Sequence, residues 1–212
     1  MATLGAYLVA GGCAAVGFFG ALEDERRRNS THEVEAEYDG FEGKNLAVVI
    51  MADRVIQSNF PGVAERIAAR VTAALAENLK GIASGYVPAA DAAYFQNNNP
   101  GWVALPLGRV AEQLGVDRLV IIELKEYRLN EPGNQYLWDG VASGSVSVVE
   151  ADSSLPDARA FERPVHVTYP DDTGFGPETM STAVVTSELS RRFATRAAWL
   201  LYTHQEPYYP DF

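Results

Sequence analysis

Histidine and cysteine side chains are the residues of this chain best suited to bind a metal or to act as nucleophiles. The three histidines, His32, His166 and His204, are far apart in the sequence, and Cys13 is the only cysteine. None of them has the short spacing to a second histidine or cysteine that is typical of zinc sites. We therefore expect surface histidines, and we predict no metal and no cofactor.

Other motifs lack the partners that catalysis would need. Residues 140–144 (GVASG) lie within a predicted strand, where they indicate a β-bulge or a close-packed position rather than a nucleophile elbow. The sequence DTG at 172–174 occurs once, whereas an aspartic protease needs two such loops. Asp139, Glu150 and Asp152 are interpreted as solvated strand ends, with a calcium site as the alternative. No catalytic residue is predicted.

Cys13 is more informative because of the segment in which it lies. Residues 1–22 (MATLGAYLVAGGCAAVGFFGAL) carry no charged side chain, and a short apolar stretch leads into small residues before the cysteine. This order is typical of a signal peptide and its cleavage site. Residues 9–13 (VAGGC) resemble the lipobox of bacterial lipoproteins, although Ala10 stands where leucine is usual. The resemblance implies that Cys13 is lipidated, becomes the new N-terminus and anchors the protein to a membrane.

Two other interpretations of residues 1–22 remain open. The segment is long enough to cross a bilayer as an uncleaved helix. Arg26, Arg27 and Arg28 would then favour a cytoplasmic side for the residues that follow. The segment also suits a buried helix in which the cysteine has no special role.

Aromatic and amide side chains gather in two stretches, 94–102 and 134–138, and could form a binding surface. Exposed aromatic residues beside amides are typical of contacts with proteins or glycans. The candidate partner-binding residues are Asn98, Trp102, Tyr136, Trp138, Tyr208 and Tyr209. In the alternative interpretation the two tryptophans cover an edge of the core, and the two tyrosines fold back onto the sheet.

The charge balance limits the class of partner. The chain has 28 acidic residues against 17 lysines and arginines, a net charge of −11, and all of these residues follow residue 22. Nucleic acid is excluded as the main partner, because binding to phosphates needs an excess of cations. Hydrophobic residues make up 47% of the chain and charged residues 21%, as in globular proteins.

The hydrophobic pattern predicts one α/β (α+β) domain. The apolar run 46–52 predicts a strand buried on both faces, and apolar residues at every fourth position predict a helix over 63–79. Further strands are expected at 84–87, 119–127, 136–149 and 161–169, and helices at 89–96, 105–114 and 178–202. The order β-α-β-α-β-β-β-α predicts a single mixed sheet with helices packed on it. We expect an anchor at 1–22, a polar tether at 23–40, the domain at 41–202 and an aromatic, proline-rich tail at 203–212.

Residues 111–120 (AEQLGVDRLV), a helix end followed directly by an apolar strand, resemble an element of bacterial envelope proteins. These are the lipoprotein activators of penicillin-binding proteins, the curli-secretion lipoprotein and the N-terminal domain of the Tol translocation protein. The resemblance covers roughly residues 45–199 and extends to uncharacterised lipoproteins of the planctomycete kind. It implies a binding module, and no catalytic residue is carried over. The pore of the curli protein is not implied, because the chain has no obvious amphipathic hairpins between its helices.

These features predict a non-enzymatic, membrane-anchored lipoprotein of the bacterial cell envelope with a periplasmic domain. Its acidic domain is expected to bind another protein in envelope assembly or maintenance. The alternatives are a structural subunit of a membrane complex held by an uncleaved N-terminal helix, and a hydrolase with an unrecognised carboxylate site.

Overall fold

The computed structural model describes residues 30–207 of the chain, which form a small two-stranded ribbon and a larger α/β domain. Cys13, Tyr208 and Tyr209 lie outside the described residues, so the predictions about them remain predictions. No helix within the described residues is both long and apolar enough to cross a membrane.

The ribbon consists of β1 (Thr31–Val34) and β7 (His204–Pro207), which pair antiparallel. Thr31 lies opposite Pro207, and the hydroxyl of Thr31 donates a hydrogen bond to Oε1 of Gln205 at 3.2 Å. The sequence did not predict these strands, because THEV and HQEP are too polar to show an apolar alternation. The two strands are also separated in the sequence by the whole domain, so no local pattern can reveal that they pair.

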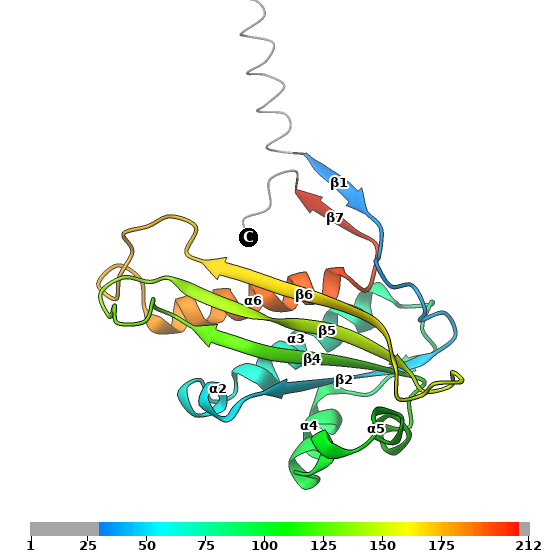
Figure 1. The fold of residues 1–212 in the computed structure, drawn as a ribbon. Helices are drawn as coiled ribbons and strands as arrows, with labels where there is room; N and C mark the ends of the chain where they lie inside the picture. Colours follow the sequence, from blue (N-terminus) through cyan, green and yellow to red (C-terminus); the bar gives the residue numbers. More distant parts are fainter. Residues whose placement is uncertain (1–29, 208–212) are drawn as a thin grey trace, which may run out of the picture. The chain divides into compact units, whose positions relative to one another are not determined.

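The domain is built on a five-stranded sheet with the order β3-β2-β4-β5-β6 (Figure 1). The strands are β2 (Asn45–Ala52), β3 (Gly85–Tyr86), β4 (Arg118–Arg128), β5 (Gly140–Glu150) and β6 (Arg159–Tyr169). β2 is parallel to both β3 and β4, whereas β4, β5 and β6 form an antiparallel meander. A mixed α/β fold was predicted and is confirmed, but the described residues form two sheets rather than one.

Helices cover both faces of this sheet (Figure 1). α3 (Val63–Asn78) and α6 (Thr182–Trp199) pack on one face and enclose the larger hydrophobic cluster. α4 (Ala89–Asn98), the 3-10 helix η1 (Trp102–Ala104) and α5 (Leu107–Leu114) lie on the other face. A second cluster forms there against β2 and β4.

The position of β2 between two hydrophobic clusters explains why its sequence is apolar without alternation. Leu46 and Val48 point into the larger cluster, whereas Ala47 and Val49 point into the second one. A strand covered on both faces needs apolar side chains at every position. The strand buried on both faces that the apolar run 46–52 predicted is therefore confirmed.

The largest differences from the prediction are one helix that was not expected and two elements that begin four residues later than expected. A short helix, α2 (Arg54–Asn59), follows β2 and was not predicted. β5 begins at residue 140 rather than 136, because Oδ1 of Asn134 accepts hydrogen bonds from the backbone N–H groups of Tyr136 and Leu137 and holds them in a turn. α6 begins at Thr182 rather than 178, because the hydroxyl of Ser181 caps its first turn.

The glycine-containing run in β5 is a close-packed position, as the sequence indicated. The register between β4 and β5 shifts between Leu124 and Glu126, which leaves Lys125 as an extra residue in β4. At this bulge a Cβ on Gly144 would lie 2.0 Å from the carbonyl oxygen of Glu123. The two backbones approach each other too closely for any side chain at residue 144.

Candidate binding cleft

The chain path leaves a crevice at the carboxyl end of β2. The connection from β2 to β3 runs through α3 on one face of the sheet, and the connection from β3 to β4 runs through α4 and α5 on the other. Where neighbouring strands are followed by helices on opposite faces, the helices diverge and leave a crevice. Open α/β sheets bind their ligands in such crevices.

A cleft of about 630 Å³ lies at this point, within the range of ordinary ligand pockets. Its lining comes from the end of β2, from α2, from the first turn of α3, from the last turns of α4 and from the loop that leads into η1. We call it the β2 cleft. It combines apolar side chains with amides and a few charged groups.

Two glutamines form one wall of the β2 cleft and bond to the main chain of β2. Nε2 of Gln96 in α4 donates to the carbonyl oxygen of Ile50 at 2.8 Å, and Nε2 of Gln57 in α2 donates to that of Ala52 at 2.7 Å. β3 pairs only with Asn45 and Leu46 and ends before these carbonyls. The glutamine amides therefore satisfy acceptors that a longer strand would otherwise have bonded.

The charged residues of the β2 cleft lie where β2 turns into α2 and where α3 begins. Asp53 caps α2, since its Oδ1 accepts a hydrogen bond from the N–H of Ile56 at 2.9 Å. Arg54 and Glu65 are exposed and line the cleft. The lining thus includes one guanidinium and two carboxylates.

The end of α4, the short loop after it and η1 also line the cleft. Asn97, Pro100, Trp102 and Val103 all line the cleft, and Val103 is 59% exposed. Trp102 is only 6% exposed, because it packs into the second hydrophobic cluster below α5. The loop indicated by the sequence is thus part of the cleft, but its tryptophan is mainly a core residue.

The other candidate residues lie apart from the β2 cleft. Asn98 is exposed at the end of α4, where its Nδ2 donates to the carbonyl of Tyr94. Tyr136 is 84% exposed in the loop between β4 and β5. Trp138 is buried, and its Nε1 donates to the carbonyl oxygen of Met180 at 2.8 Å. The two tryptophans thus follow the alternative interpretation, in which they cover the core.

Sequence reasoning missed the polar residues of the cleft. Asp53, Arg54 and Gln57 follow directly after the predicted strand 46–52, and Gln96 ends the predicted helix 89–96. The usable signal was the position of the first three at the carboxyl end of a doubly covered strand. Gln96 gave no signal, since a glutamine at a helix end resembles any solvated residue.

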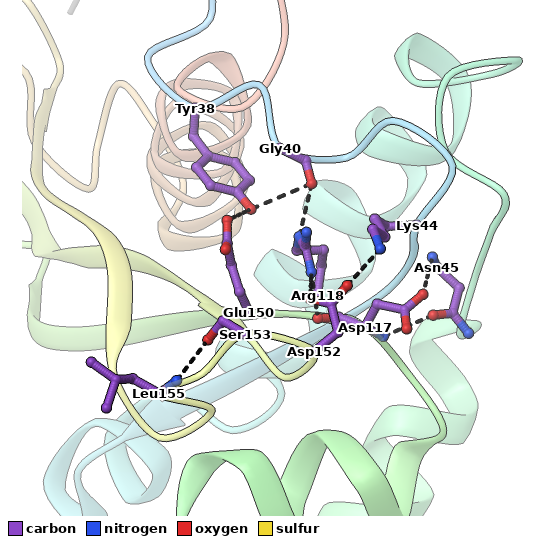
Figure 2. Close-up of polar contacts among 10 residues, drawn as sticks. All are labelled: Tyr38, Gly40, Lys44, Asn45, Asp117, Arg118, Glu150, Asp152, Ser153 and Leu155. Atoms are coloured by element: carbon purple, nitrogen blue, oxygen red, sulfur yellow. Dashed lines mark hydrogen bonds and ion pairs between the residues drawn. The ribbon is translucent and has the colours of Figure 1, made fainter.

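A polar cluster holds together the opposite end of the sheet, where β2 and β4 begin (Figure 2). The N–H of Asn45 donates to Oδ2 of Asp117 at 3.2 Å, and the N–H of Asp117 donates to Oδ1 of Asn45 at 2.8 Å. Arg118 is buried and donates to the carbonyl oxygens of Gly40 and Asp117 and to the carboxylate of Asp152. These hydrogen bonds connect Gly40, in the segment before β2, with the first residues of β2 and β4.

Two carboxylates that the sequence suggested were solvated belong to this cluster. Oε1 of Glu150 accepts a hydrogen bond from the hydroxyl of Tyr38 at 2.9 Å, and Asp152 bonds to Lys44 and Arg118 (Figure 2). These hydrogen bonds, first that from Lys44, lower the pKa of Asp152 to about 2. Burial, and then the bond to Glu150, raise the pKa of Tyr38 well above its ordinary value. Glu150 is half-buried rather than solvated, because Tyr38 in the segment before β2 bonds to it. Asp152 is exposed, as predicted for a strand end, but it is also paired with Lys44 and Arg118.

We expect the Asp152→Asn substitution to lower the free energy of unfolding at pH 7 by about 1 kcal/mol. A pKa lowered to about 2 corresponds to a stabilisation of at most about 2.5 kcal/mol. The Asp152 side chain is about one-third exposed, so screening by solvent leaves only part of this stabilisation. Because the folded pKa is below the unfolded one, this contribution is complete above about pH 4 and is lost as the pH falls towards 2.

Urea denaturation of both proteins between pH 2 and pH 7 measures this dependence. The exposed Asp172→Asn change is the control and is expected to have little effect at any pH. A difference between wild type and Asp152→Asn that stays constant over the whole range would contradict the assignment.

Metal ligands do not gather in residues 30–207. These residues contain no group of three or more histidine, cysteine, aspartate or glutamate side chains that could hold a metal ion. His32 and His204 lie in the ribbon, whereas His166 lies in β6 of the domain.

Comparisons with known proteins show distant similarities of fold. No protein-family model matches the chain, and no curated protein matches it. PelC from Paraburkholderia phytofirmans, solved as a dodecamer, is 12% identical over 82% of this chain and 97% of its own, with a TM-score of 0.46. Lipoprotein GNA1162 from Neisseria meningitidis is 14% identical over 69% and 92%, with a TM-score of 0.45. A DUF330 protein from Xanthomonas campestris is 11% identical over 80% and 90%, with a TM-score of 0.44.

The structural neighbours thus include a bacterial lipoprotein. None of the three is described as a penicillin-binding-protein activator, a curli-secretion protein or a Tol domain, which are the modules that the sequence resembles.

Proposed function

We propose that this chain is a membrane-anchored protein of the bacterial envelope whose α/β domain binds another protein through the β2 cleft. The observation that carries the proposal is the β2 cleft itself, at the point of the sheet where the following helices diverge. Its walls offer amides and an exposed apolar residue, Val103, which are the groups that protein interfaces use. The anchor rests on the uncharged residues 1–22 and Cys13.

We propose that the domain acts by binding rather than by catalysis. The two glutamines of the wall already bond to main-chain carbonyls, and one carboxylate oxygen of Asp53 caps α2. Such groups can hold and orient a partner. General acid or base catalysis instead needs a proton-transferring group within hydrogen-bond reach of a reacting atom.

The anchor is tested by the intact mass of the native protein and of a Cys13→Ala variant. We expect wild type to begin at residue 13 with added acyl mass and to remain in the membrane fraction until detergent is added, since two or more acyl chains give stable anchoring. Cys13→Ala should carry no acyl mass. Val16→Ala, which leaves residues 9–13 unchanged, is the control. An unacylated wild type that retains residues 1–12 would contradict lipidation and favour the uncleaved helix.

The partner is tested in the same cells with a photoreactive side chain placed at Asn97, on the wall of the β2 cleft. We expect irradiation to join this position to one other envelope protein. The same side chain at Gln113, exposed on α5, is the matched control and should give no such product. Equal products from both positions would contradict binding at the cleft.

A further inference from the structure

The sheet has a gap along the outer edge of β2. β4 pairs with this strand from Leu46 to Ala52 on one side, but β3 pairs only with Asn45 and Leu46 on the other. The last main-chain bond at this edge runs from the N–H of Val87 to the carbonyl of Leu46. Beyond it, the β2 cleft takes the place of a neighbouring strand along the second half of β2.

Main-chain carbonyls of even-numbered residues accept hydrogen bonds along this edge, at residues 44, 46, 50 and 52. The carbonyl oxygens of Lys44 and Leu46 accept from the N–H groups of Ser84 and Val87. The carbonyls of Ile50 and Ala52 continue the row and accept from the side-chain amides of Gln96 and Gln57. A two-residue repeat of acceptors is the pattern that a β-strand presents to another strand. The glutamine amides therefore occupy positions suited to main-chain N–H groups.

The walls leave room for a main chain. Ala52, Ala64 and Ala93 line the β2 cleft from β2, α3 and α4, and such small side chains let a backbone approach closely. Val103 on the rim can contact the side chains of an incoming strand. Asp53 and Glu65 against Arg54 give the lining an excess of one negative charge, which favours a basic residue in the occupant.

We propose that the occupant of the β2 cleft is an extended polypeptide segment with a basic residue, which pairs with the outer edge of β2 at Ile50 and Ala52. Its N–H groups would take the place of the glutamine amides and extend the row begun by β3. This inference rests on the proposed function and names the chemistry of the partner. Gln57 is exposed and Gln96 is half-buried, so both amides can turn towards other acceptors or water when displaced.

A displayed library of random twelve-residue peptides, selected on the full chain in detergent, provides the probe. We expect the selected peptides to be enriched in lysine or arginine and to bind wild type with micromolar affinity. Ala93→Trp fills the cleft and should weaken binding at least tenfold. The matched control Ala90→Trp adds the same group to an exposed position of α4 and should bind as wild type does. Circular dichroism and the melting temperature check that both variants are folded.

Main-chain pairing is then tested by N-methylation of a selected peptide, one residue at a time. An N-methyl group removes one donor, so we expect losses of about tenfold at alternate residues and little change between them. Hydrogen exchange at the N–H groups of Ile50 and Ala52 should slow when the peptide is bound. Tolerance of N-methylation at every position, or equal binding to Ala93→Trp and wild type, would overturn the proposal.

The two hypotheses can fail separately. If a photoreactive side chain at Asn97 captures one envelope protein but no peptide shows alternate N-methyl losses, the proposed function stands and the strand-like occupant is wrong. If the photoreactive side chain at Asn97 gives no such product while selected peptides pair with β2, the inference of an extended, basic occupant stands. The proposed envelope partner is then wrong.

Discussion

The Arg118→Met variant should unfold with a free energy about 3 kcal/mol lower than that of wild type. Its guanidinium is buried and bonds to two main-chain carbonyls, those of Gly40 and Asp117, and to the carboxylate of Asp152. Methionine preserves much of the volume but leaves these acceptors without their donor. A buried acceptor left without its donor costs about 1–3 kcal/mol, and two main-chain carbonyls lose theirs here. A value towards the lower end of their sum is expected because Asp152 keeps its bond to Lys44.

Urea denaturation at pH 7 with an unchanged slope checks this value. Arg159→Met is the matched control, since Arg159 pairs with Glu123 and Glu162 on the surface of the sheet with 31% of its side chain exposed. A surface pair contributes at most about 1 kcal/mol. If the two variants lose the same free energy, the cluster around Arg118 does not hold the two strand starts together.

The Gly144→Ala substitution is expected to cost at least about 3 kcal/mol, by overpacking against a rigid backbone. The added Cβ would lie 2.0 Å from the carbonyl oxygen of Glu123 and 3.0 Å from its carbonyl carbon. Both atoms belong to β4 beside the bulge, so the clash can be relieved only by separating β4 from β5. We expect a lower melting temperature and a lower yield of soluble protein.

Gly85→Ala is the control for this change. Gly85 also lies in a strand, but no atom lies within 4 Å of the position that its Cβ would take. Its expected effect is within about 0.5 kcal/mol. Similar melting temperatures for the two variants would show that β4 and β5 approach each other less closely than described here.

The elements that could be predicted from the sequence are those whose buried residues follow a regular pattern along the chain. β2 was recognised because both of its faces are covered, and α3 because Val63, Ile67, Val71 and Leu75 form one buried stripe. α2 was missed because it has only six residues and a single buried one, Ile56, so no period can develop. Its start depends on one hydrogen bond, donated by the N–H of Ile56 to the capping Asp53, which a search for periodicity does not detect.

The candidate site was harder to predict than the fold, because it depends on where chain connections cross. The loop at 97–102 was noticed for its composition and does line the β2 cleft. The amides of Gln57 and Gln96 gave no comparable signal, since their role appears only once β3 is known to stop at Tyr86. A strand that ends early is a property of the assembled sheet rather than of any local run of residues.

The pairing of β1 with β7 also limits the order in which the chain can fold. The hydroxyl of Thr31 bonds to a residue 174 positions later, so β1 stays unpaired until β7 is available. The antiparallel strands β4, β5 and β6 follow one another directly and can pair as they emerge. An unpaired strand that waits is a hazard for aggregation when it is apolar. The polarity of THEV, which hid β1 from prediction, makes the unpaired strand a poor template for such aggregation.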